Sequence, residues 1–155
     1  MKLSLVLATA VFSCLIGPLK AQVLTPEPEL SLFISEPKLI LEKEAHYCLI
    51  NFELKNNTLD EIEFRTWSCS WQGYFSINKM ELKIVAPFCD KNFPETKNLA
   101  GQEVWKRSIK LKLNPGYSLP IAFKLGMDFI RVLHEEKLSD SGVIIWSNEL
   151  TIVKQ

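Results

Sequence analysis

The segment with the most distinctive chemistry runs from Thr66 to Phe75 and reads TWSCSWQGYF. Trp67, Cys69 and Trp71 follow one another at a spacing of two, which places side chains on one face of a regular β-strand. If the strand that begins near residue 62 continues regularly, this face points to solvent. Trp67, Trp71 and Tyr74 would then form a flat aromatic platform, a surface that stacks on sugar rings or anchors a protein partner.

A second interpretation of the same segment places the tryptophans inside the protein. A β-bulge near Thr66 would shift the strand by one residue and move every following side chain to the other face. Trp67 and Trp71 would then pack around a disulfide. Because large aromatic side chains are mostly buried, this interpretation is favoured. The exposed platform of Trp67, Trp71 and Tyr74 is the binding surface to test against it.

The two remaining tryptophans give different signals. Trp105 shares the parity of Ile109 and Leu111, so we expect it in the core. Trp146 comes directly before Ser147 and Asn148, and the pattern is compatible with either a buried or an exposed ring.

The cysteines indicate one disulfide and one free thiol. The chain has four cysteines, and Cys14 lies in an N-terminal segment that we expect to be removed. Cys48 shares a strand face with Ile50, where a lone cysteine behaves as a small hydrophobic side chain. Cys69 and Cys89 lie near loops, so we predict a disulfide that closes a loop of ~20 residues and contributes roughly 3 kcal/mol. No Cys-x-x-Cys pair or neighbouring histidine points to a metal site.

Residues suited to catalysis or metal binding are few. His134, Glu135, Glu136 and Asp140 lie close together in the polar segment 131–142 and could hold a cation, but a solvated acidic loop explains them more simply. The sequence contains no GxSxG elbow, phosphate-binding glycine loop or dinucleotide fingerprint, and no pair of acids stands out for glycoside hydrolysis. We therefore predict a protein that is not an enzyme and has no metal or cofactor.

Lysines form a second charged feature. Lys106, Lys110 and Lys112 share one strand face, with Lys83 expected nearby. Such a face could bind an anionic glycan. A solvated surface or an edge strand protected by charge is the favoured interpretation.

A glycosylation sequon is present at Asn56-Asn57-Thr58. It has meaning only in a eukaryotic secretory pathway. Two successive asparagines are also typical of a turn, and we expect a turn here.

Short strands must position these residues. Apolar and polar residues alternate at 30–34, 48–54, 62–64, 80–84, 109–113, 119–127 and within 143–153. The residues at 39–41, after Pro37, are expected to continue the edge formed by the first run. No stretch has convincing helical periodicity. About seven strands at this spacing predict an immunoglobulin-like antiparallel β-sandwich, with a small barrel as the alternative. We expect the polar segment 131–142 to be a long loop or one short helical turn between two apolar strands. Long loops often carry function, but a solvated connection explains this segment equally well.

The first 21 residues have the layout of a secretory signal peptide. Lys2 precedes an apolar stretch that is too short to span a ~30 Å hydrocarbon core, and Ala21 is a small residue at a plausible cleavage point. The residues before Cys14 loosely resemble a lipobox, so a lipid anchor there is a minor alternative. We assign 1–21 to a signal peptide, 22–29 to a short linker and 30–155 to the sandwich domain, and we expect an exported protein (periplasmic, cell-surface or secreted).

Composition limits the possible classes of protein. The chain has 155 residues, of which 47% are hydrophobic and 23% charged, and its formal net charge is +0. This is enough chain for one domain with a core, and it excludes a disordered tail and a polytopic membrane protein. A neutral chain is also unsuited to general nucleic-acid binding, which needs a basic surplus. No second apolar run is long enough for a membrane span.

Several motifs together give the chain a resemblance to a family. They are WSCSW at 67–71, CDKNFP at 89–94, the lysine-rich strand that ends in NPG at 114–116, and IWSNE at 145–149. With these motifs the chain resembles exported proteins of Bacteroidota type with an immunoglobulin-like fold. The resemblance spans most of the mature chain and implies the fold, but it brings no activity with it. Residues 101–116 are also similar, over a short length, to a small β-sandwich family of proteinase inhibitors.

The sequence therefore predicts an exported, non-enzymatic module that binds another protein at the cell envelope or outside the cell. The first alternative is a glycan-binding module that uses Trp67, Trp71 and Tyr74. The second is a protease inhibitor, which would need an exposed, rigid loop. A hydrolase is the least favoured class.

Overall fold

The computed structural model describes residues 28–35, 37–132 and 142–154. The expected signal peptide at 1–21, with Cys14, lies outside these residues, as does 22–27 of the expected linker. The acidic group proposed for a cation also lies outside them: His134, Glu135, Glu136 and Asp140.

The described residues form twelve strands and one short 3-10 helix. The elements are β1 (Leu30–Ile34), β2 (Lys38–Glu42), β3 (Ala45–Asn56), β4 (Ile62–Trp67), η1 (Trp71–Tyr74), β5 (Phe75–Ile77), β6 (Leu82–Val85), β7 (Pro94–Leu99), β8 (Val104–Leu113), β9 (Ile121–Phe123), β10 (Leu125–Phe129), β11 (Val143–Trp146) and β12 (Leu150–Ile152). Every strand pair is antiparallel. The prediction of an all-β antiparallel sandwich is confirmed, but the expected number of about seven strands was wrong.

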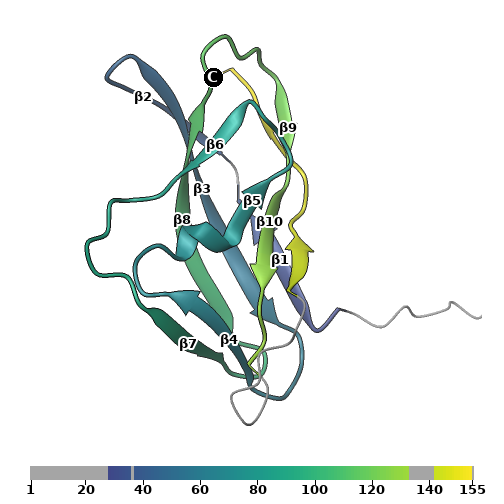
Figure 1. Ribbon diagram of the computed structural model, residues 1–155. Coiled ribbons are helices and arrows are strands. Elements are labelled where there is room, and N and C mark those ends of the chain that lie inside the picture. The colour runs from purple at the N-terminus through teal and green to yellow at the C-terminus, as the bar shows by residue number, and fades with distance from the viewer. Residues whose placement is uncertain (1–27, 36, 133–141, 155) are drawn as a thin grey trace, which may run out of the picture.

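The first layer is a five-stranded sheet in the order β1-β3-β8-β6, with β2 also paired to β3. β3 and β8 run the length of the molecule (Figure 1) and pair from Tyr47 with Lys112 to Lys55 with Val104. Alternate residues of β3 are buried, among them Ile50 at 1% exposed. β1 and β2 pair with different parts of β3, so they follow one another along the same edge, as expected.

The second layer consists of shorter sheets with the orders β11-β10-β5, β12-β9 and β4-β7. A bridge between Phe64 and Arg131 joins β4 to the chain that follows β10, and the Arg65 amide donates to the Ile130 carbonyl at 2.9 Å. Burial of apolar side chains between the layers stabilises the fold. The largest fully buried side chains include Phe52 of the first layer and Phe64 and Phe123 of the second.

Two expected strands are each divided in the structure. The run at 119–127 gives β9 and β10, because the chain changes partners at Lys124: β9 pairs with β12, whereas β10 pairs with β11 and β5. The run within 143–153 gives β11 and β12. Between them, the Ser147 amide donates to the Leu125 carbonyl at 2.9 Å, and the Leu125 amide donates to the Ser147 hydroxyl at 3.0 Å.

The expected strand at 80–84 begins two residues late. Met80 lies in a turn and is 91% exposed, and the strand starts at Leu82. Two further strands, β5 and β7, had not been expected. β7 reads PETKNL, and its sparse apolar content gave no alternation to detect.

Asn56 shows why the sequon acts as a turn. Its side chain is fully buried, and its amide nitrogen donates to the carbonyls of Asp60, Leu99 and Ala100 at 2.7, 3.1 and 3.0 Å. Its side-chain oxygen accepts from the amide and the hydroxyl of Thr58. The side chain therefore ties the end of β3 to the end of β7, and in the folded protein it has no room for a glycan.

No helix within the described ranges is both long enough and apolar enough to cross a membrane.

Candidate functional site

β4 carries Trp67 to the outer surface in a regular register. Ile62, Phe64 and Thr66 are all buried on one face, so no bulge shifts the strand at Thr66. Trp67 is the last residue of the strand, lies on the opposite face and pairs with Pro94 of β7. The strand therefore continues regularly up to Trp67, as the platform interpretation requires.

Trp71 lies elsewhere, because the chain turns after Trp67 and enters η1. The Trp71 ring packs inward, with its centroid 5.7 Å from that of Phe52, 5.9 Å from that of Phe75 and 6.0 Å from that of Trp105. The inward placement that the sequence favoured thus applies to Trp71, but a turn produces it instead of a bulge. Trp67 and Trp71 do not share one exposed face.

Two other aromatic side chains also pack against the core. Trp105 is half-buried there, as expected, and its ring lies 5.2 Å from that of Phe52. Tyr74 is half-buried against the core as well. The structure therefore does not bring Trp67, Trp71 and Tyr74 together as one flat platform.

The predicted disulfide between Cys69 and Cys89 is present, with 6.3 Å between the Cα atoms. Cys48 is the free, buried cysteine among the described residues. Burial raises the pKa of the Cys48 thiol from 9.0 to about 12, so this thiol stays protonated in the folded protein at neutral pH.

The disulfide fixes the loop of residues 86–93, which we call the clamped loop, against the turn after β4. The Asn92 side-chain oxygen accepts from the Cys69 amide at 3.4 Å and the Ser70 amide at 3.3 Å, and its nitrogen donates to the Ser70 hydroxyl. The Ser68 amide donates to the Phe93 carbonyl at 3.0 Å, and the Phe93 amide donates to the Ser68 hydroxyl at 3.2 Å. The disulfide therefore holds the loop at Cys89, and hydrogen bonds hold its C-terminal end at Asn92 and Phe93.

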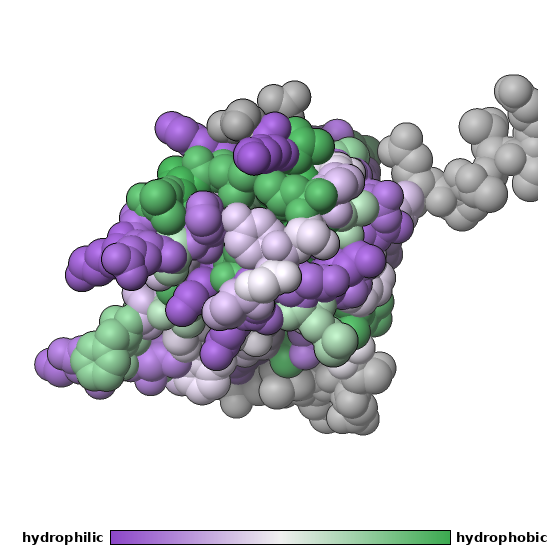
Figure 2. Space-filling model, turned by 90° about the horizontal axis from the view of Figure 1, so that it is seen from above, coloured by the Kyte–Doolittle hydropathy of each residue, from purple (hydrophilic) through white to green (hydrophobic). Residues whose placement is uncertain are grey.

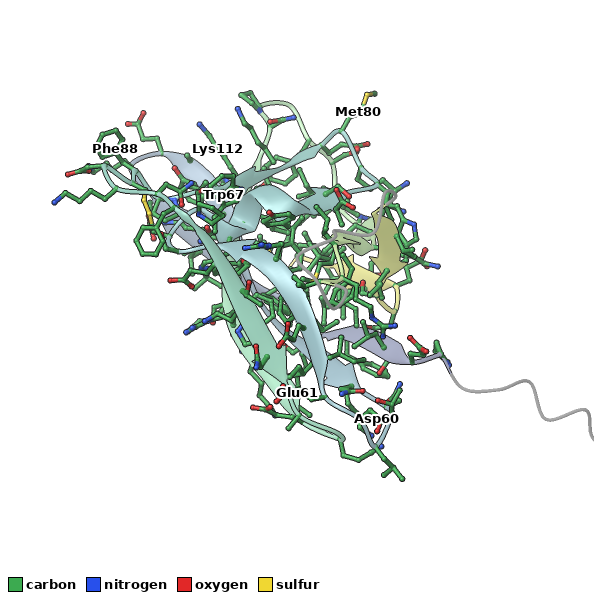
Figure 3. All side chains as sticks on the ribbon, turned by 60° about the horizontal axis from the view of Figure 1, so that its bottom comes forward. Asp60, Glu61, Trp67, Met80, Phe88 and Lys112 are labelled. Atoms are coloured by element: carbon green, nitrogen blue, oxygen red, sulfur yellow. A yellow bond between two sulfur atoms is a disulfide. The ribbon has the colours of Figure 1, made fainter. Side chains whose placement is uncertain are left out.

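The clamped loop displays aromatic side chains instead of burying them. Phe88 is 94% exposed and Phe93 is 57% exposed. Figure 3 shows Phe88 and Trp67 at the same end of the molecule, with the disulfide close to both. We call Trp67, Phe88 and Phe93 the aromatic set. Sequence reasoning missed both phenylalanines. The position of Phe88 next to a disulfide cysteine, in a segment without alternation, could have signalled that residue.

A second aromatic feature lies on the outer face of the β11-β10-β5 sheet. Trp146 pairs with Gly126 of β10, and Gly126 pairs with Ser76 of β5. The ring of Trp146 is 46% exposed, whereas Gly126 beneath it is buried. The sequence pattern left Trp146 undecided, and the structure places its ring partly in solvent.

A shallow groove continues from this tryptophan along the same face. Tyr74, Ser76, Asp128 and Ile144 line it. Burial of Tyr74, followed by the negative charge of Asp128, raises the pKa of the Tyr74 hydroxyl, and the positive charge of Arg65 partly opposes this shift. The Tyr74 hydroxyl therefore remains a hydrogen-bond donor at neutral pH.

Two of the four lysines on the lysine-rich face are paired with acids. Lys106 bonds to Glu53 at 2.6 Å, and Lys110 pairs with Glu42. The Lys110 ammonium also lies 4.2 Å from the centroid of the Tyr47 ring. Lys83 and Lys112 are opposite one another in neighbouring strands. Glu53 and Glu42 therefore offset the charges of Lys106 and Lys110, which an anionic glycan would need.

The end of the molecule that carries the β2–β3 hairpin has an apolar surface. Figure 2 views this end and shows hydrophobic side chains gathered on one side of it. Leu39, Leu41, Tyr117 and Leu119 line a groove there, and Leu41 is 65% exposed. The ring of His46 contacts that of Tyr117 edge-on at 5.6 Å, so His46 takes part in packing.

Comparison with known proteins does not assign this chain to a family. No protein-family model matches the chain, and no curated protein is similar to it. Among solved structures, a FixG-related protein from Vibrio parahaemolyticus is similar at 10% sequence identity and a TM-score of 0.39. That match covers 83% of this chain and 99% of the other.

Within the described residues, no group of three or more His, Cys, Asp or Glu side chains is placed to hold a metal ion.

Proposed function

We propose that this chain is an exported, non-enzymatic binding module that engages another protein at the cell envelope or outside the cell. The aromatic set would make the contact. The observation that carries the proposal is the near-complete exposure of Phe88, at 94%, on a loop held by a disulfide.

The energetics of protein interfaces support this choice. Leaving a phenylalanine in water forgoes roughly 1.5–3 kcal/mol of burial free energy. A partner that covers Phe88 and Phe93 would recover this free energy, and aromatic side chains near the centre of an interface often dominate its affinity. Because the disulfide and the Asn92 hydrogen bonds already order the clamped loop, binding would cost little additional conformational entropy.

The test is affinity capture from an envelope extract of the cells that make the protein. The bait is the immobilised mature chain, and bound proteins are identified by mass spectrometry. The binding variant is Phe88→Ala/Phe93→Ala. The matched control is Phe33→Ala, which removes another phenylalanine, 53% exposed, from β1 in the other layer.

We expect the wild type and Phe33→Ala to capture the same partner and Phe88→Ala/Phe93→Ala to lose it. The same set of proteins on all three baits would contradict the proposal. So would the absence of any protein enriched over a blank resin.

A protease inhibitor is a second candidate, and the clamped loop favours it. An inhibitor of this kind presents a rigid, exposed loop to the protease, and Phe88 on this loop would suit a deep apolar specificity pocket such as that of chymotrypsin. Titration of chymotrypsin should then give stoichiometric inhibition that Phe88→Ala removes, with the loop left intact. Rapid cleavage after Phe88 without inhibition would exclude this candidate.

A further inference from the structure

The packing of Trp146 on Gly126 creates a flat aromatic surface. A Cβ atom added to Gly126 would lie 2.8 Å from Cζ3 and 3.0 Å from Cε3 of the Trp146 ring. Both distances are shorter than carbon atoms can adopt without displacing the ring. Only glycine at this position lets the tryptophan lie directly on the backbone of β10. One side of the ring is supported by the sheet, and the side chain remains 46% exposed.

Polar groups stand beside this ring. The same added Cβ would lie 2.9 Å from the Ser76 hydroxyl oxygen, so the hydroxyl and the ring reach Gly126 from neighbouring strands on either side. Asp128 is two residues further along β10 on the same face. Asp128, together with Tyr74 and Ile144, lines the adjoining groove.

We propose that Trp146, Ser76 and Asp128 form a binding site for a pyranose ring of an uncharged polysaccharide. The ring of the sugar would stack on the exposed side of Trp146. Its hydroxyl groups would reach the Ser76 hydroxyl, the Asp128 carboxylate and the Tyr74 hydroxyl. The site uses none of the three residues of the aromatic set, so it stands independently of the proposed protein contact.

The chemistry of the site favours a neutral sugar over other ligands. A pyranose with equatorial substituents presents C–H groups on its faces and hydroxyl groups around its rim, which matches a flat ring bordered by hydrogen-bonding groups. A carboxylate accepts strong hydrogen bonds from hydroxyl groups. The same carboxylate repels an anionic sugar. β-Linked glucans have the required equatorial substituents.

The test is native affinity electrophoresis of the mature chain in gels that contain soluble mixed-linkage β-glucan or hydroxyethyl cellulose. A gel with polygalacturonate tests an anionic polymer. The binding variants are Trp146→Ala and Gly126→Ala, since the added Cβ displaces the ring. Trp146→Tyr keeps a stacking ring, and Phe88→Ala/Phe93→Ala leaves the site intact. Circular dichroism checks that each variant is folded.

We expect β-glucan to retard the wild type and the Phe88/Phe93 variant equally. Trp146→Ala and Gly126→Ala should weaken binding roughly tenfold or more, equivalent to about 1.4 kcal/mol, and Trp146→Tyr should keep part of the retardation. Three results would each overturn the proposal: no retardation of the wild type in either β-glucan gel, equal retardation of Trp146→Ala, or stronger retardation by polygalacturonate. Loss of protein capture without loss of β-glucan binding would separate the failure of one proposal from the failure of the other.

Discussion

The two layers of the sandwich differ in the length of their strands and in the exposure of their aromatic side chains. In the first layer, β3 and β8 are long and pair continuously over most of their length, and their inward side chains are almost completely buried. In the second layer, the strands are short and change partners at Lys124. The three exposed aromatic residues considered as binding groups, Phe88, Phe93 and Trp146, belong to this layer or to the loop that enters it.

We infer from this difference that the two layers have different roles. Long, regular strands satisfy their backbone groups with few breaks and bury a continuous core. The ends of short strands need additional local contacts. Here these are the Cys69–Cys89 disulfide, the hydrogen bonds of the buried Asn56 side chain to the end of β7, and the packing of Trp146 on Gly126. The disulfide and the glycine also hold Phe88 and Trp146 in positions where their side chains remain exposed. We therefore expect stability to depend most on the first layer and binding to depend on the second.

The largest expected effect tests the first half of this comparison. Phe52→Ala should lower the free energy of unfolding by about 3–5 kcal/mol, because it opens a cavity where four aromatic rings meet; its partners are Trp71, Phe75 and Trp105. Phe88→Ala should change it by less than ~0.5 kcal/mol. Urea unfolding of both variants measures this. Equal losses would show that the clamped loop contributes as much stability as the core.

The next effect concerns the disulfide. Replacement of both cysteines, Cys69→Ser/Cys89→Ser, should cost roughly 3 kcal/mol because the unfolded chain regains the freedom of the closed loop. Limited proteolysis should then cleave within residues 86–93 first, since the loop has lost its covalent tie. Cleavage elsewhere before this loop would argue against the disulfide as the device that orders it.

A smaller loss is expected at the junction of the layers. Asn56→Ala removes the amide that serves three backbone carbonyls, and it should lower stability by about 1–3 kcal/mol because buried groups lose their partners. Asn98→Ala is the matched control. Within the described residues, the Asn98 side chain donates only to Glu61 at the surface, and the loss of stability in this variant should stay within ~0.5 kcal/mol. Thermal unfolding compares the two variants.

The smallest effect is the pH dependence of stability that the buried Cys48 gives to the first layer. Burial holds the pKa of Cys48 near 12, against 9.0 in the unfolded chain. Below pH 9 both states keep the proton, whereas above it the unfolded state releases the proton first. Stability should therefore fall as pH rises, by about 1 kcal/mol between pH 9 and 10. Chemical unfolding at pH 9 and 10 should show this contribution in the wild type and its absence in Cys48→Ala.

The elements of the first layer could be predicted well from the sequence. Cys48, Ile50 and Phe52 alternate with polar residues, and a strand with one buried face must show this pattern. The disulfide followed from the placement of Cys48 on that face, which left Cys69 and Cys89 to pair. The common edge of β1 and β2 followed from the break at Pro37.

The second layer was harder to predict because alternation does not reveal partners. The run from Leu119 to Met127 alternates without interruption, but Lys124 marks a change of partner strand that only the fold decides. Trp71 turned inward because a 3-10 helix interrupts the spacing of two. Phe88 and Trp146 lie where local sequence does not decide exposure, since that depends on which segments cover them.

The contact between Trp146 and Gly126 has a consequence for the evolution of this chain. Because any larger residue at position 126 would collide with the ring, the two positions cannot change independently. A glycine in the middle of one strand and a tryptophan twenty positions later, in its antiparallel neighbour, form a pair that drift should either keep together or lose together. Homologous chains that retain both residues would inherit the same surface, and those that lose the tryptophan would be free to replace the glycine.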